Sequence, residues 1–179
     1  MNKIDITTYQ PKSTDKFFFD NNVWMYIFYP MGNYNKLAID KYSEFLGKVL
    51  DVGARIYVCS QILSEFYNSC LRLDFNLWKD EDSSRRKSQF KRDFRPIERC
   101  KETSKILAMS IESQIVGASI RIDDSFSKID IPNIMERVGE LDYNDSYFVE
   151  LCEKNDLTMV SHDRDFLKVK EDITLVTLI

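Results

Sequence analysis

The sequence predicts a three-layer α/β/α fold, in which helices cover both faces of a mainly parallel central sheet. Short apolar segments typical of strands alternate with amphipathic helical segments along most of the chain, and parallel strands need such helical crossovers. The length of 179 residues fits one domain, and 44% hydrophobic with 30% charged residues is an ordinary globular composition. We therefore assign residues 1–179 to a single domain, with a basic helical insert at about residues 79–117.

The first predicted strand is the aromatic run Phe17–Phe19, which follows the polar residues 1–15. It stops abruptly at Asp20, a pattern typical of a buried strand whose carboxyl end opens into a turn and a helix. Residues 36–50 place apolar side chains near a period of 3.6, which predicts an amphipathic helix that closes around Gly53.

A second strand is predicted at residues 55–59. Directly after it, Ser60 is well placed to cap a helix that runs through Glu65 towards Trp78. A basic segment follows, and Pro96 is expected to break it. The pattern up to this point is therefore strand and helix in alternation.

A long helix is predicted at residues 97–116. Its expected apolar stripe comprises Ile106, Leu107, Met109, Ile111 and Ile115. Residues 117–131 show no clear pattern, whereas residues 132–138 are compatible with a short helix.

Another helix is expected to begin after Asp142, which can cap it, and to carry Asp145 in its first turn. This helix should bury one apolar face and end near Asn155. Strands at residues 157–161 and 173–178 complete the prediction.

The composition excludes several classes of protein. No apolar run approaches the roughly 20 residues that cross a bilayer, and the polar start is unlike a leader, so we expect a cytoplasmic protein without a membrane partner. A single histidine, His162, argues against histidine-based metal or triad chemistry. The cysteines are far apart, which predicts reduced thiols and neither a zinc cage nor a disulfide scaffold: Cys59, Cys70, Cys100 and Cys152.

Carboxylates are the chemistry-bearing groups that remain. Ligand sites of open parallel sheets lie beyond the carboxyl ends of the strands, which is where Asp20 and Asp163 stand. Glu65 and Asp145, near the starts of two helices, can reach the same edge. Four such acids would repel one another unless a divalent cation joined them, and oxygen-only ligands favour Mg²⁺ or Mn²⁺ over zinc.

Each of these acids also has a plainer explanation. Asp20 and Asp142 can be helix caps, and Asp165 can support its neighbours or simply be solvated. Glu65 can face solvent, although apolar neighbours suggest that it lies near a buried face, where an unpaired acid would be costly.

The net charge of −4 hides a strong local polarity. Residues 83–105 hold nine bases and three acids, so this segment carries +6 and the remainder of the chain −10. Such a segment is often only a solvated face. It can also contact the phosphates of RNA or dock a protein partner, and the residues expected to contact RNA are Arg85, Arg86, Lys87, Lys91, Arg92 and Arg95.

Taken together, these motifs resemble the PIN-domain family of nucleases, in particular the bacterial toxin-type (VapC-like) members. The matching features are the strand that ends in Asp20, with Asn22 two places on, and Glu65 near the start of a helix. They also include Asp145–Ser146 at a helix start and the segment 161–166. Two features depart from the pattern: a longer stretch between the second and third acids, and an Asn pair where Ser or Thr is more usual.

The resemblance implies the roles of individual residues. Asp20, Glu65, Asp145 and Asp163 would be the catalytic acids, with Glu65 as a metal ligand or water orienter and the three aspartates as metal ligands. Asn22 and Ser161 would orient the water or the acids. Asp142 and Asp165 would support them.

The resemblance also implies a function and partners. It indicates a Mg²⁺- or Mn²⁺-dependent endoribonuclease that hydrolyses RNA phosphodiesters, acts as the toxin of a toxin–antitoxin pair, and has a cognate antitoxin and a homodimeric state. The aromatic residues of the first helix fit either a dimer interface or core packing: Trp24, Tyr26, Phe28 and Tyr29.

Two other functions compete with the nuclease. A catalytically inactive PIN-like module could use the basic insert to bind RNA or protein, because fold does not fix function. A phosphatase of the haloacid-dehalogenase type needs a second Asp two residues after its nucleophile, and Asn22 occupies that place.

Overall fold

The computed structural model describes residues 1–124 and 126–178, and within them six strands form one sheet in which every adjacent pair is parallel. The spatial order is β1-β6-β5-β2-β3-β4. This arrangement confirms the predicted mainly parallel sheet. The strands are β1 (Asn2–Asp5), β2 (Lys16–Phe19), β3 (Arg55–Val58), β4 (Ile120–Arg121), β5 (Thr158–Val160) and β6 (Thr174–Thr177).

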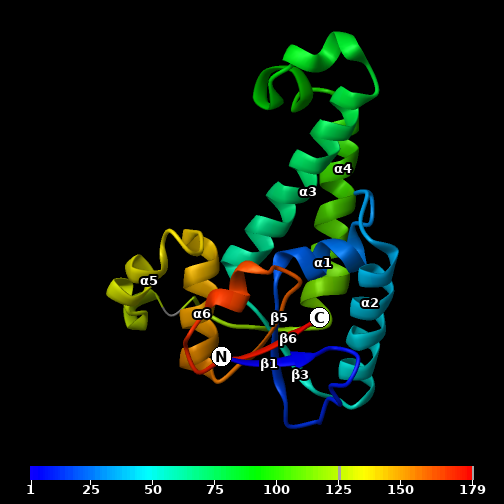
Figure 1. The fold of residues 1–179 in the computed structure, drawn as a ribbon. Coiled ribbons are helices and arrows are strands. Elements are labelled where there is room, and N and C mark those ends of the chain that lie inside the picture. Colours follow the sequence, from blue (N-terminus) through cyan, green and yellow to red (C-terminus); the bar gives the residue numbers. More distant parts are fainter. Residues whose placement is uncertain (125, 179) are drawn as a thin grey trace.

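Helices connect these strands and flank the sheet (Figure 1). The α-helices are α1 (Asn21–Phe28), α2 (Lys36–Asp51), α3 (Ser60–Asp80), α4 (Glu98–Met109), α5 (Ile131–Arg137) and α6 (Tyr143–Asn155). Short 3₁₀ segments are η1 (Ser83–Lys87), η4 (Phe126–Lys128) and η5 (Asp165–Lys168), and π-helical segments are η2 (Phe90–Phe94) and η3 (Ser110–Val116).

The central strand β2 shows why the fold has three layers. Successive side chains of a strand point to opposite faces of its sheet, and all three phenylalanines of β2 are fully buried. The Phe17 ring lies 5.6 Å from that of Phe45 on α2, whereas the Phe18 ring lies 5.2 Å from that of Phe148 on α6. The strand is therefore apolar on both faces because a helical layer covers each face.

Two predicted features of the helices were wrong in detail. Ser60 is the first residue of α3 and not its cap; Cys59 precedes the helix without a side-chain capping bond. The helix predicted at residues 97–116 divides into α4 and the π-helical η3. Of its expected apolar stripe, Ile106 and Met109 are 58% and 67% exposed, because this helix rests on α3 and has one face in solvent.

Strand β1 was not predicted from the sequence. Its residues are exposed or half-buried, so they lack the apolar run that marked the inner strands. The strand exists because its backbone pairs in parallel with β6 at the edge of the sheet, from Asn2 opposite Thr174 to Asp5 opposite Thr177. The conformation of β1 is therefore determined by its pairing with β6 and not by the strand preference of its own residues.

The helices α3 and α4 pack side by side and project from the sheet as an arm, with η1 and η2 at its tip (Figure 1). Aromatic side chains form a small core within the arm: Phe75, Trp78, Phe90 and Phe94. The guanidinium of Arg85 lies 4.6 Å from the centre of the Trp78 ring and closes this core on one side. The basic segment is therefore ordered by its aromatic neighbours.

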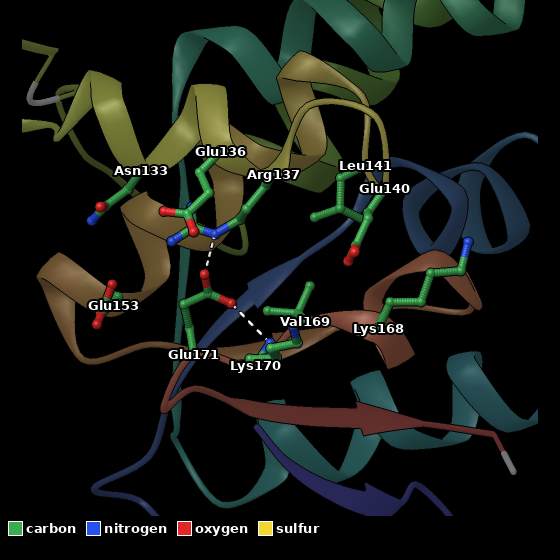
Figure 2. A pocket seen from close by; sticks show the side chains of 10 residues that line it. All are labelled: Asn133, Glu136, Arg137, Glu140, Leu141, Glu153, Lys168, Val169, Lys170 and Glu171. Carbon is green, nitrogen blue, oxygen red and sulfur yellow. Dashed lines mark hydrogen bonds and ion pairs between the residues drawn. The ribbon is translucent and has the colours of Figure 1, made fainter.

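A buried ionic cluster joins α5, α6 and the segment before β6. Figure 2 shows its contact between Arg137 and Glu171. Arg137 bonds Glu150, which is fully buried, at 2.6 Å, and it also bonds Glu171. Arg137 and Glu171 line a hollow of about 420 Å³, and none of the predicted site acids lines it.

The four cysteines are free and buried, as predicted for reduced thiols. Within residues 1–124 and 126–178, no helix combines the length and the apolar character needed to cross a membrane. The aromatic residues of α1 serve mainly the core, since Trp24 and Tyr29 are buried and the Phe28 ring stacks on that of Trp24.

Candidate active site

Asp20 lies at the carboxyl end of β2 and caps α1. Its carboxylate is 4% exposed and accepts three hydrogen bonds. The donors are the backbone N–H of Asn21 at 2.7 Å, the Asn22 amide at 2.5 Å and the Ser161 hydroxyl at 2.7 Å. The Asp20 side chain therefore caps α1 and also belongs to the acids at the carboxyl ends of the strands.

Ser161 and Asn22 connect Asp20 to the segment after β5. The Ser161 hydroxyl accepts the backbone N–H of Asp163 at 3.0 Å, which fixes the start of the acidic turn. The side-chain oxygen of Asn22 accepts the N–H of His162 at 3.1 Å. Parallel pairing of β2 with β5 brings these residues together, so both predicted supporting residues contact the first acid.

Glu65, in the second turn of α3, is held by two side-chain amides that the sequence analysis did not single out. Asn21 and Asn144 each donate to one of its carboxylate oxygens, at 3.2 Å. Gln61 in turn donates to Asn144 at 2.8 Å. The available signal was position, since Asn21 and Asn144 stand next to Asp20 and Asp145 in the chain.

Asp145 begins the first turn of α6, and Asp142 caps that helix by accepting the Asp145 N–H at 2.9 Å. The cap interpretation of Asp142 is thus confirmed. Asp163 accepts the backbone N–H of Asp165 at 2.8 Å, whereas the carboxylate of Asp165 pairs with Lys168 in an exposed ion pair. Asp165 therefore supports Asp163 through its backbone N–H and not through its carboxylate.

The electrostatics link acids from distant parts of the chain. Burial, followed by repulsion from Asp20 and other acids, raises the pKa of Asp145 to about 8 and that of Glu65 to about 7. Burial raises the pKa of Asp20 to about 6, and the negative charge of Asp163 adds to the effect. The four predicted acids therefore share one field at the carboxyl ends of β2, β3 and β5.

The chemistry of these side chains suits a hard divalent cation. The donors are oxygens, and the pKa values of Asp20, Glu65 and Asp145 reflect no neighbouring Lys or Arg. Within the described residues, no three acidic, thiol or imidazole groups stand close enough to enclose an ion. Like charges repel, so the acids would have to draw together around a bound cation.

The predicted nucleic-acid residues lie in the arm, apart from the acids. Two of them are already engaged: Arg85 pairs with Glu81 and Asp82, and Arg92 pairs with Asp93 at 2.7 Å. Lys91 and Arg95 are exposed and line a hollow between α3 and α4.

The family model of the PIN domain matches residues 17–172, a range that leaves out β1 and β6, the two neighbouring strands at one side of the sheet. The chain belongs to the PIN domain family. In this PIN domain all four acids lie within the matched region, Asp20 and Asp163 after β2 and β5, and Glu65 and Asp145 near the starts of α3 and α6. The resemblance inferred from the sequence is thereby confirmed.

A solved structure with a similar fold is the crystal structure of VapBC2 from Rickettsia felis bound to a DNA fragment from their promoter. It matches with a TM-score of 0.55 and 12% identity, over 90% of this chain and 98% of that chain. At this identity the likeness shows a shared fold. No curated protein sequence matches the chain.

Proposed function

We propose that this PIN domain is a metal-dependent endoribonuclease that hydrolyses RNA phosphodiester bonds and acts as the toxin of a toxin–antitoxin pair. The observation that carries the proposal is the acid cluster, in which burial, followed by repulsion from Asp20 and the other acids, raises the pKa of Asp145 to about 8. Carboxylates that lie close together without a compensating cation destabilise the folded protein. Such a cluster therefore indicates a functional site. Family membership and the fold shared with a VapBC complex support the nuclease over other uses of this cluster.

Each acid has a distinct proposed role. Asp20, Asp145 and Asp163 would hold Mg²⁺ or Mn²⁺, and Glu65 would orient the attacking water or join the ligands. Such an ion, when bound, lowers the pKa of water and neutralises charge on the scissile phosphate. Asn22 and Ser161 keep the Asp20 carboxylate in one orientation, and Asn21 and Asn144 do the same for Glu65.

The proposal extends to the setting of the reaction. RNA as substrate rests on the resemblance to toxin-type members, and a cognate antitoxin is the partner that this role requires. We place the protein in the cytoplasm, where its buried free thiols would stay reduced. A homodimer is also proposed, although Trp24 and Tyr29, which lie in the core, contribute little to an exposed interface.

The decisive experiment incubates the purified chain and total RNA with Mg²⁺, with Mn²⁺ or with EDTA. The Asp20→Asn and Asp145→Asn variants are assayed beside it, since Asn keeps the shape of Asp without its charge. Lys154→Gln, which changes an exposed charge at the far end of α6, is the matched control. Metal-dependent cleavage that both Asn variants lose and the control retains is the expected result.

Two results would contradict the proposal. Cleavage that survives in both Asn variants would reject the site. A folded protein that binds RNA but cuts none with either metal would instead favour the binding module.

A further inference from the structure

We propose that a basic hollow between α3 and α4 is a binding site for the phosphate backbone of single-stranded RNA, next to the acid cluster. The inference rests on the proposed nuclease and adds a substrate-binding surface to it. The basic hollow is defined by the five cationic residues that line it, Arg72, Lys91, Arg95, Lys101 and Lys105.

The charge of the basic hollow is not compensated. No Asp or Glu lines it within the described chain. Among the described residues, Lys101 alone of these five forms an ion pair, with Glu98 at 3.3 Å, and both side chains are more than half exposed, so this pair is weak. In a protein with a net charge of −4, such a concentration of unpaired cations indicates an anionic ligand.

The size and construction of the basic hollow fit a segment of nucleic-acid backbone. Its volume of about 520 Å³ lies within the range of about 300–1,000 Å³ found for ligand sites. The Arg72 guanidinium is held 4.3 Å from the centre of the Phe90 ring, which limits its mobility. Asn68 and Ser104 add neutral polar groups, and Tyr67 adds an aromatic ring of the kind on which bases stack.

The position of the basic hollow favours RNA over an acidic peptide. Arg72 follows Glu65 by seven residues of α3, so the two lie on the same side of the helix about 10 Å apart along its axis. A strand with one phosphate at the acid cluster can therefore place neighbouring phosphates beside the arm. Charge alone would attract either ligand, but this continuity with the site of cleavage applies only to the substrate.

The test measures fluorescence anisotropy of a labelled polyuridylate of about 20 nucleotides, in EDTA, between about 50 and 200 mM KCl. The variant is Lys91→Gln/Lys105→Gln, which removes two exposed lysines that form no ion pair within the described residues. The matched control is Lys12→Gln/Lys154→Gln, which removes two exposed lysines that precede β2 and β5, at the amino ends of the strands. Circular dichroism checks that all the proteins are folded.

We expect the basic-hollow variant to bind several-fold more weakly and its dependence of log K on log salt to become shallower by about 1.4, or about 0.7 for each phosphate contact of a single strand. The control should match the wild type. Equal affinity and salt dependence in both variants would overturn the proposal. It would also fall if the basic-hollow variant lost binding of a labelled oligoglutamate while its RNA binding stayed intact.

This experiment separates the two proposals. If RNA binding depends on the basic hollow but the protein cleaves no RNA, the binding proposal stands and the nuclease proposal is rejected. If the protein cleaves RNA with metal but its RNA binding does not depend on the basic hollow, the nuclease proposal stands and the binding proposal is rejected.

Discussion

At the scale of single residues, Ser161 is the contact that completes the surroundings of Asp20. Its hydroxyl donates to the Asp20 carboxylate and accepts the backbone N–H of Asp163, so one buried group orients two acids. No other residue touches both acids through one atom in the described part of the chain. The geometry of the acid cluster therefore depends on a neutral side chain as much as on the acids.

Replacing Ser161 with Ala should destabilise the protein by about 1–3 kcal/mol, because a buried carboxylate and a backbone N–H each lose a partner. The loss of this donor should also raise the pKa of Asp20 further above 6. Urea unfolding measures the stability, with Ser60→Ala as the control because Ser60 is exposed and caps nothing. A Ser161→Ala variant as stable as this control would contradict the assigned role.

The raised pKa of Asp145 predicts a pH dependence of stability without metal. Between the unfolded value near 4 and the folded value of about 8, the folded state holds a proton that the unfolded chain has released. The stability from this group is complete below pH 4 and is lost as pH rises through 8; Asp20 and Glu65 act in the same direction.

Asp145→Asn should therefore raise Tm in EDTA, and the gain should be larger near pH 8.5 than near pH 5. Each kcal/mol of relieved repulsion corresponds to about 2–4 °C for a chain of this size. Thermal unfolding at the two pH values measures the effect. An equal gain at both would mean that Asp145 ionises normally in the folded protein.

At the scale of elements, the sequence predicted what local patterns determine. The central strand β2 carries an uninterrupted apolar run because both of its faces are buried, and Asp20 directly after it marked the site edge. The edge strand β1 has no such pattern, and the amides of Asn21 and Asn144 acquire their role only when α1, α3 and α6 meet. These features depend on tertiary contacts and were not predictable from local sequence.

The ionic cluster that joins α5 and α6 should be sensitive to the loss of one partner. Arg137→Gln leaves Glu150 buried without a cation, which should cost about 3–5 kcal/mol. The double variant Arg137→Gln/Glu150→Gln should recover part of that loss, because no buried charge remains at position 150. Denaturant unfolding of these two variants and of the single variant Glu150→Gln gives the coupling, and strictly additive effects would show that the pair does not interact.

The aromatic core of the arm should be a separate region of stability. Phe94 is fully buried among Phe75, Trp78 and Phe90, so Phe94→Ala should remove about 3–5 kcal/mol of packing. The arm rests on its own small core, and faster amide hydrogen exchange should be confined to residues 75–105. Uniform acceleration through the sheet as well would show that the arm and the sheet unfold together.

At the scale of the whole molecule, α3 carries Glu65 of the acid cluster near its start and Arg72 of the basic hollow about two turns further on. The cluster is negative and the hollow is positive, so we expect a bound divalent ion to strengthen the binding of a polyanion that reaches the acids as well as the hollow.

Mn²⁺ or Mg²⁺ should raise Tm, and the increase should be greater at pH 8 than at pH 6. The ligands must be deprotonated to bind, and the pKa values of Glu65 and Asp145 lie between about 7 and 8. Differential scanning fluorimetry with Ca²⁺-free buffers measures the shift, and Asp20→Asn should remove most of it. A metal-induced shift independent of pH would place the bound ion away from these acids.

The pairing of β2 with β5 has a consequence for the protein during its own synthesis. The bond from Ser161 to Asp20 spans 141 residues, so the first acid leaves the ribosome long before the residues that orient it. A nascent chain can close the α3–α4 arm early, since its contacts are local, but β5 must emerge before the acids can assemble. We therefore expect the acid cluster to stay unassembled on the nascent chain until β5 has left the ribosome, so that any activity of the cluster begins only after that point.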